Sequence, residues 1–216
     1  KQETIIMNYD NIKEIIEKVE EPFVSVNCIC RQDKDLLEDP CKITSRREVC
    51  MGFGPFAQMY IDLGWGRQIT REEGLAILKK NEEDGLIFQP GNAQKPGFVC
   101  SCCTCCCLGL IHLKQHPAPA DLTTSNYFAK IDPDSCTGCE TCINICQMDA
   151  ISLEDDYSTI NRKRCIGCGN CLLVCPSEAI TLHKKSKQHV PPVTEEDLYE
   201  KMAQMREKVI KAEKSS

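Results

Sequence analysis

Two cysteine runs with identical spacing constrain this chain more than any other feature of its sequence. The first run consists of Cys136, Cys139, Cys142 and Cys146, and the second run consists of Cys165, Cys168, Cys171 and Cys175. Both read C-x2-C-x2-C-x3-C, and a shift of 29 residues superimposes them. The same shift places Gly138 on Gly167 and Ile151 on Ile180. Two copies of one unit, each too small to bury a core alone, predict a single domain with pseudo-twofold symmetry.

The spacing within each run suits a [4Fe–4S] cluster. Three thiolates close together can cap one face of a cubane, while the fourth is displaced along the chain toward a second cluster. Residues 126–184 resemble the bacterial-type two-[4Fe–4S] ferredoxin family, in which the last cysteine of each run ligates the opposite cluster. The resemblance implies that one cluster is held by Cys136, Cys139, Cys142 and Cys175. It implies that the other is held by Cys165, Cys168, Cys171 and Cys146.

Zinc binding and disulfide bonds are the alternatives for a chain this rich in cysteine. A zinc site needs four thiolates, but it does not require this tight spacing or its repetition. A disulfide scaffold is typical of short secreted domains, whereas this chain has 216 residues and shows no recognisable signal peptide. The spacing therefore favours two [4Fe–4S] clusters. Short strands are predicted to flank two cysteine-bearing helices, near Tyr127–Ile131, Ile151–Leu153, Thr159–Asn161 and Ile180–Leu182.

One position departs from the family pattern. Pro176 follows the second run, but Gln147 follows the first. Proline fixes the backbone and removes an N–H, so Gln147 restores a donor that can hydrogen-bond a cluster sulfur or extend a helix. We therefore expect the two clusters to differ in reduction potential.

Ten of the eighteen cysteines lie outside the two runs. They fall in two segments and comprise Cys28, Cys30, Cys41, Cys50, Cys100, Cys102, Cys103, Cys105, Cys106 and Cys107. Thiolates so close together repel one another and oxidise readily unless a metal neutralises them. We therefore expect the two segments to converge on shared metal sites in a small N-terminal domain.

The spacing of these ten cysteines over residues 24–110 has a looser resemblance to the N-terminal region of some bacterial and archaeal iron–sulfur proteins. That resemblance implies redox cofactors, and we favour one or two additional Fe–S clusters. A four-thiolate zinc site is an alternative that the ligand set suits equally well. A labile thiol–disulfide switch among the adjacent cysteines 102–107 is the third.

The remaining sequence of the N-terminal domain, residues 1–112, predicts a mostly helical scaffold. Apolar stripes follow Asp10 and Pro55, and a capping box at Thr70 and Glu73 opens a third helix that ends near Gly85. A hairpin is predicted after it, because the segments 86–89 and 97–100 flank a turn rich in proline and glycine.

Helices followed by a hairpin resemble a winged helix, so an iron–sulfur or redox-sensing regulator is the rival function. Charge argues against DNA as a partner, because 26 Lys and Arg stand against 32 Asp and Glu, a formal net charge of −6. Binding to the phosphate backbone requires a basic face, and Arg46 with Arg47 is too short for one. We therefore expect no nucleic-acid partner.

The fold class is predicted as α+β. A helical, cysteine-rich N-terminal domain is joined by a linker over residues 113–125 to the ferredoxin-like domain at 126–184. Residues 185–216 are predicted to form a second linker and an amphipathic helix capped by Thr194 and Asp197. One stripe of that helix consists of Leu198, Met202, Met205 and Val209. A methionine-rich stripe suits docking to a protein partner.

These features predict an electron-transfer protein that is a subunit or dedicated partner of a larger oxidoreductase, with a flavoprotein as one possible partner class. No catalytic residue is predicted, since we find no nucleotide-binding glycine loop and no nucleophile paired with a base. A free ferredoxin shuttle would need only the repeat, and an enzyme would need an open metal position near Cys100–Cys107. No apolar run is long enough to span a membrane. Thiolates that must stay reduced predict a cytoplasmic, anaerobic setting.

Overall fold

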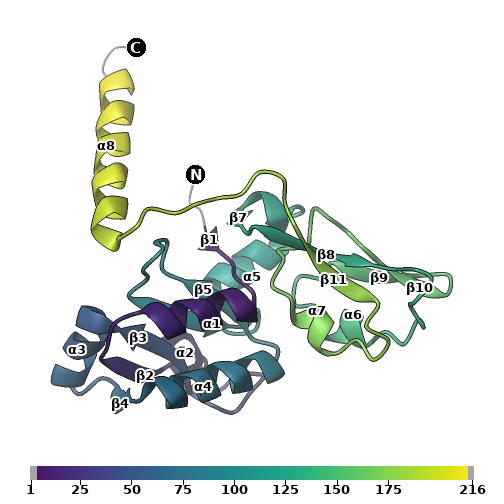
Figure 1. The fold of residues 1–216 in the computed structure, drawn as a ribbon, viewed down its shortest axis with the longest axis horizontal. Coiled ribbons are helices and arrows are strands. Elements are labelled where there is room, and N and C mark those ends of the chain that lie inside the picture. The colour runs from purple at the N-terminus through teal and green to yellow at the C-terminus, as the bar shows by residue number, and fades with distance from the viewer. Residues whose placement is uncertain (1–3, 214–216) are drawn as a thin grey trace.

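The computed structural model describes residues 4–213 (Figure 1). Its N-terminal part contains β1 Thr4–Ile5, α1 Tyr9–Lys18, β2 Phe23–Asn27, α2 Ile29–Leu36, β3 Glu48–Phe53, α3 Gly54–Asp62, β4 Arg67–Ile69, α4 Arg71–Glu83, β5 Ile87–Pro90, β6 Phe98–Cys102 and α5 Leu108–Gln115. A 3-10 turn η1 Pro119–Asp121 and β7 Thr123–Thr124 follow, and β7 pairs in parallel with β1. The remaining elements are β8 Tyr127–Ile131, α6 Thr141–Ile145, β9 Ile151–Glu154, β10 Tyr157–Ile160, α7 Asn170–Leu173, β11 Ile180–Lys184 and α8 Glu195–Glu213.

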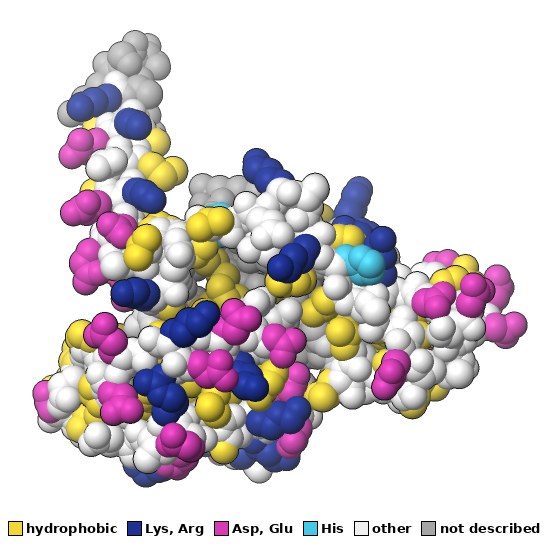
Figure 2. Space-filling model, viewed as in Figure 1, with side chains coloured by type: hydrophobic (Ala, Val, Ile, Leu, Met, Phe, Trp, Pro, Cys, Tyr) yellow, Lys and Arg dark blue, Asp and Glu magenta, His cyan; other side chains and the backbone are white. Residues whose placement is uncertain are grey.

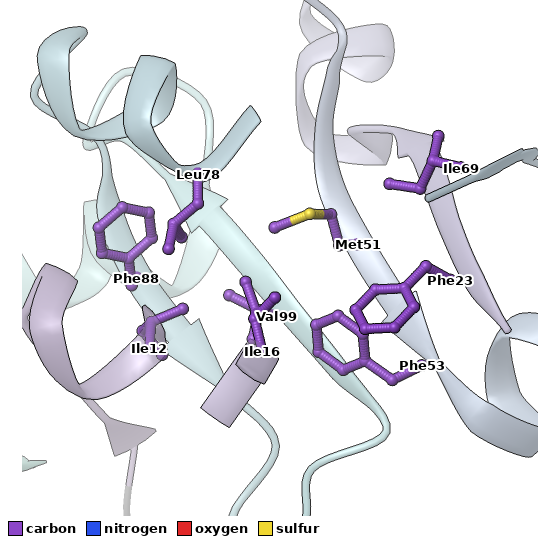
Figure 3. Packing of buried hydrophobic residues seen from close by; sticks show 9 residues of the cluster. All are labelled: Ile12, Ile16, Phe23, Met51, Phe53, Ile69, Leu78, Phe88 and Val99. Atoms are coloured by element: carbon purple, nitrogen blue, oxygen red, sulfur yellow. The ribbon is translucent and has the colours of Figure 1, made fainter. Parts of the chain in front are cut away.

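A five-stranded antiparallel sheet forms the centre of the N-terminal domain, with strand order β4-β2-β3-β6-β5. Figure 3 shows its main core, in which Ile12 and Ile16 of α1 and Leu78 of α4 face apolar side chains of the strands. Phe23 and Phe53 stack edge to face with ring centroids 5.2 Å apart. Burial of these large side chains, at about 25 cal/mol per Å² of apolar surface, holds the two helices on the sheet.

The prediction of a mostly helical N-terminal domain is therefore wrong in its architecture. The expected helices are present as α1, α3 and α4, although α1 begins at Tyr9, before Asp10, and is capped by Asn8. Three strands, β2, β3 and β4, were not predicted. The expected hairpin is present as β5 and β6, but β6 also pairs with β3, so the hairpin extends the sheet and is not a free wing.

The region of the two cysteine runs contains the expected strands and helices. Each half consists of a strand, a short helix and a second strand, namely β8-α6-β9 and β10-α7-β11. The strands β8 and β11 pair antiparallel from opposite ends of the repeat, and β9 pairs with β10 as a hairpin. The halves therefore enclose one core, which includes Ala129, Ile151 and Ile180.

The C-terminal helix α8 extends away from the rest of the chain (Figure 1). Its N-terminus is capped as predicted, because Thr194 Oγ1 accepts from the Asp197 N–H and Asp197 Oδ2 accepts from the Thr194 N–H, both at 3.1 Å. Glu195 fixes this end to the sheet domain by accepting from the Gly97 N–H at 3.0 Å. Met202, Met205 and Val209 are 57%, 64% and 56% exposed, so most of the apolar stripe is open to solvent in the described chain. Among residues 4–213, no helix combines the length and apolarity that crossing a membrane requires.

Candidate metal centres

Four cysteines from both runs line one cavity in the C-terminal half of the repeat. They are Cys146, Cys165, Cys168 and Cys171. Cys146 belongs to the first run by sequence, but it ends helix α6 with its side chain toward the second run. We call this space the second-run cavity. Its other walls are mostly apolar and include Ala129, Ile151, Ile160 and Ile166, together with the polar residues Gln147 and Asn170.

Close backbone approach shapes this cavity. Gly167 has φ +70°, and a Cβ there would lie 2.2 Å from the carbonyl oxygen of Tyr127. No side chain fits at that position. The loop between Cys165 and Cys168 can therefore lie this close to β8 only if residue 167 is glycine. The Ala150 N–H donates to Cys146 Sγ at 3.3 Å. Such N–H donors stabilise a thiolate and set its orientation.

The other half of the repeat holds Cys136, Cys139 and Cys142. The Ser158 N–H donates to Cys136 Sγ at 3.4 Å, and Ser158 Oγ lies 3.7 Å from Cys142 Sγ. The fourth expected ligand, Cys175, shares an apolar cluster with Cys142. Cys139 is exposed, whereas none of the four cysteines that line the second-run cavity is, so the first-run site is the one closer to solvent.

The second-run cavity fits a cationic metal–sulfur group. Burial, together with the neighbouring Cys146 and Cys165, raises the pKa of the Cys168 thiol to about 12. Burial likewise raises the pKa of Cys146. Four thiols in an apolar cavity therefore become thiolates only when metal ions supply compensating positive charge. The cavity between the four sulfurs is consistent with binding of a metal–sulfur group.

The ten N-terminal thiols separate into two groups. The first, which we call the four-thiol site, consists of Cys41, Cys103, Cys105 and Cys106, whose sulfurs all lie within 4.8 Å of one another. The distances from Cys41 Sγ to Cys103 Sγ and Cys105 Sγ are 3.6 and 3.7 Å, and Cys103 and Cys105 are 3.4 Å apart. Sulfurs this close could bind one common metal ion.

Arg31 is the largest fully buried side chain of the described chain, and it lies against the four-thiol site. Its Nε donates to Cys41 Sγ at 3.4 Å, and its Nη2 donates to Cys103 Sγ at 3.3 Å. Nη1 donates to the carbonyl oxygen of Ser101 at 3.0 Å. Within residues 4–213 no ion pair joins Arg31 to a carboxylate. Because a guanidinium stays charged, its counter-ions are the sulfurs.

The second group forms a closed ring of six thiols. In ring order they are Cys28, Cys30, Cys107, Cys102, Cys100 and Cys50, and each interacts with the two beside it. We call this group the six-thiol ring. The central sheet brings the two cysteine segments together, because β3 and β6 pair at Met51 and Val99, next to Cys50 and Cys100. Cys28 and Cys107 stand at the N-terminal caps of α2 and α5.

Protonation alternates around the six-thiol ring. Hydrogen bonds from Cys30 and Cys50 lower the pKa of Cys28 to about 2, and hydrogen bonds from Cys102 and Cys50 lower that of Cys100 to about 4. Hydrogen bonds with Cys107 and Cys28 raise the pKa of Cys30, and hydrogen bonds with Cys100 and Cys28 raise the pKa of Cys50. Neighbouring thiols of the ring therefore share protons. Bound metal ions would displace these protons.

An apolar cluster connects the six-thiol ring to the second-run cavity. Cys100, Cys102 and Cys107 of the ring belong to the same cluster as Cys146, Cys165 and Cys168 of the cavity. Leu110, Met148 and Ile166 fill the cluster between them. The two groups of sulfur ligands are therefore packed together with dry contacts rather than separated by a flexible linker.

The sequence analysis missed Arg31 and Asn170, and it missed the side-chain hydrogen bonds of Gln147. Gln147 and Asn170 each donate to the carbonyl oxygen of Gly85 at 2.6 Å, which joins the repeat to the end of α4. The effect of Gln147 comes from its side chain, whereas the prediction concerned its backbone N–H. Arg31 carried a signal, since it directly follows Cys30, but its partners become neighbours only in the folded chain.

Comparison with known families agrees with this geometry. Residues 129–182 match a family model described as a 4Fe-4S dicluster domain, and residues 164–209 match a second model with the same description. The chain therefore contains a 2[4Fe–4S] ferredoxin-type domain. No curated protein matches the chain.

Proposed function

We propose that this protein transfers single electrons through two [4Fe–4S] clusters and one further iron–sulfur centre at the six-thiol ring. The proposal rests mainly on Cys146, which crosses from the first run to line the second-run cavity with Cys165, Cys168 and Cys171. That crossing is the exchange of the fourth ligand that a two-cluster ferredoxin requires. The other cluster is then assigned to Cys136, Cys139, Cys142 and Cys175.

When bound, each [4Fe–4S] cluster supplies one-electron redox chemistry. The chain orients the ligand thiolates and excludes water from them. The Ala150 and Ser158 N–H groups hold Cys146 and Cys136 in place. Ile151 and Ile166 are nearly fully buried and keep the second-run cavity dry. These are the features by which a protein tunes a cluster potential.

The six-thiol ring is assigned to the further redox centre because of its position. It shares an apolar cluster with the second-run cavity, so an electron can pass between the two without crossing solvent. Six thiolates also exceed the four that a mononuclear ion or a single cubane uses. The ring therefore suits a polynuclear iron–sulfur centre with six protein ligands.

In the proposed electron-transfer pathway, the first-run cluster is the end nearest to solvent. Cys139 is exposed, and the first-run cluster would therefore be the one that a redox partner reaches. We further propose that this partner is a larger oxidoreductase or a flavoprotein. The exposed stripe of α8, including Met202 and Met205, supports the role of a docked subunit over that of a free shuttle.

A DNA-binding regulator receives no support from the fold. The hairpin of β5 and β6 is part of the central sheet. Arg46 pairs with Asp84 at 2.7 Å and Arg47 pairs with Asp35 at 2.5 Å, so both arginines are already engaged. Acidic and basic side chains are interspersed on the face shown in Figure 2. No continuous basic surface appears on that face.

The test is iron and sulfide analysis with EPR of the reduced protein, purified without oxygen. We expect more than about eight irons per chain, of which about eight belong to the two cubanes. The variant Cys146→Ser should alter the EPR signal of the second-run cluster, and Cys175→Ser should alter that of the first-run cluster. Cys50→Ser should lower the iron content of the six-thiol ring and leave both cubane signals intact. A wild-type content below about six irons would contradict the two-cluster proposal.

A further inference from the structure

The four-thiol site is too tight for a cubane. Cys41, Cys103, Cys105 and Cys106 have sulfurs within 4.8 Å of one another, with contacts of 3.4 to 3.7 Å. Four irons and four sulfides must lie among the thiolates of a [4Fe–4S] cluster, and sulfurs in mutual contact leave no such space. A tetrahedral zinc ion with Zn–S bonds of about 2.3 Å places its sulfurs about 3.8 Å apart. We infer that these four cysteines bind a single zinc ion with four-coordinate geometry.

Arg31 supplies the charge balance that a buried zinc–thiolate site needs. Four thiolates around one Zn²⁺ leave a net charge of about −2. The Arg31 guanidinium is fully buried and donates to Cys41 Sγ and Cys103 Sγ, so it offsets part of that charge at the ligand atoms. A metal-bound anion beside Arg31 balances this buried cation, because an unpaired buried charge is strongly unfavourable.

The zinc site is separate from the six-thiol ring although the two share a stretch of chain. Cys100 and Cys102 of β6 belong to the ring, whereas Cys103, directly after β6, belongs to the four-thiol site. Successive side chains of an extended strand point to opposite faces, so neighbouring cysteines reach different centres. Arg31 lies on the Cys103 side, where it also binds the Ser101 carbonyl oxygen.

A zinc ion here would anchor a segment that has little core of its own. Residues 37–47 connect α2 to β3 without helix or strand, and most of them are exposed. Cys41 is the point at which this segment meets the turn of Cys103, Cys105 and Cys106. Four protein ligands close the coordination sphere, which is the arrangement of a structural zinc site and leaves no position for a substrate.

The first experiment needs no variant. The full chain is purified without oxygen from cells supplied with both iron and zinc, metals are counted per chain, and X-ray absorption is recorded at the zinc edge. We expect about one zinc with four sulfur neighbours at about 2.3 Å. Absence of zinc, or nitrogen and oxygen neighbours at the zinc, would overturn the inference. Neither result depends on the iron content, so failure of the zinc site is distinguishable from failure of the electron-transfer proposal.

A matched pair of variants then locates the ion. Cys105→Ser should remove most of the zinc and leave iron and sulfide unchanged. Cys139→Ser, at an exposed cysteine of the first run, should lower iron and sulfide and leave zinc unchanged. If Cys105→Ser instead removes one iron, or about four irons with their sulfide, the site holds iron and the inference is wrong.

Discussion

Gln147 hydrogen-bonds to the backbone of Thr104, with Gln147 Oε1 accepting from the Thr104 N–H at 2.8 Å. Thr104 lies between Cys103 and Cys105 of the four-thiol site, and Gln147 directly follows Cys146 of the second-run cavity. One side chain therefore connects two groups of proposed metal ligands that are more than forty residues apart in sequence. Proline, which occupies the matching position after the second run, has no group that could make this bond.

Replacing Gln147 should loosen the contact between the two domains. Gln147→Leu leaves the Thr104 N–H without its partner and removes one of the two donors to the Gly85 carbonyl oxygen, which keeps its bond from Asn170. A buried group left unpaired costs about 1–3 kcal/mol, so the free energy of unfolding should fall by about 1–3 kcal/mol. Anaerobic urea denaturation of the loaded protein measures this change. Gln204→Leu on the exposed face of α8 serves as the control and should change stability by less than about 0.5 kcal/mol. Equal effects from both variants would contradict this assignment.

Arg31 should be essential for the four-thiol site. Arg31→Met removes the only cation that hydrogen-bonds the Cys41 and Cys103 sulfurs in the described chain. Breaking a buried charge pair in this way destabilises by about 3–5 kcal/mol, and we expect loss of zinc together with a lower unfolding midpoint. Arg31→Lys should recover only part of the effect, because an ammonium lacks the planar fork that reaches both sulfurs.

The matched control for Arg31 is Arg67→Met. Arg67 is 49% exposed and pairs with Glu48 and Glu73 at 2.8 Å, so its removal should change the free energy of unfolding by about 1 kcal/mol or less. Metal content should not change in this variant. Normal zinc content and stability in Arg31→Met would refute the counter-charge role.

Gly167→Ala should damage the second-run cavity. The added Cβ would lie 2.2 Å from the Tyr127 carbonyl oxygen, which belongs to strand β8 and cannot move independently. Gly64→Ala is the control, since Gly64 has a similar φ of +68° and no heavy atom within 4 Å of the added Cβ. Both variants introduce backbone strain of about 1 kcal/mol, but only Gly167→Ala introduces a clash. We expect iron loss and a lower unfolding midpoint in Gly167→Ala alone, and equal behaviour of the two would disprove the steric explanation.

Ser158 should tune the potential of the first-run cluster. Its Oγ lies 3.7 Å from Cys142 Sγ, and Ser158 is almost fully buried. A hydroxyl donating to a ligand thiolate stabilises the more negative, reduced cluster, so Ser158→Ala should lower that cluster's reduction potential. Redox titration followed by EPR measures the shift. Ser152→Ala removes an exposed hydroxyl that contacts only Thr159 and should leave the potential unchanged. A shift in the second-run cluster, or none in either, would argue against this role.

Local signals predicted the parts of the fold that depend on near neighbours in sequence. The repeat predicted all four strands, with β8, β9 and β11 starting at the observed residues and β10 two residues too late, and the capping box at Thr70 placed α4, because turns, caps and cysteine spacing act over a few residues. The strands β2, β3 and β4 escaped prediction because their hydrogen bonds come from partners distant in the chain. Phe23, for example, pairs with both Phe53 and Ile69.

The sequence by itself determined the two cysteine runs, their internal repeat and hence the 2[4Fe–4S] ferredoxin-type domain, since ligand spacing is a local property. Only the tertiary structure decided how the other ten cysteines divide. Cys102 and Cys103 are adjacent in sequence, yet the alternation of an extended strand sends one to the six-thiol ring and the other to the four-thiol site. The pairing of β3 with β6 and the burial of Arg31 complete that division. Both depend on long-range packing, for which spacing along the chain carries no signal.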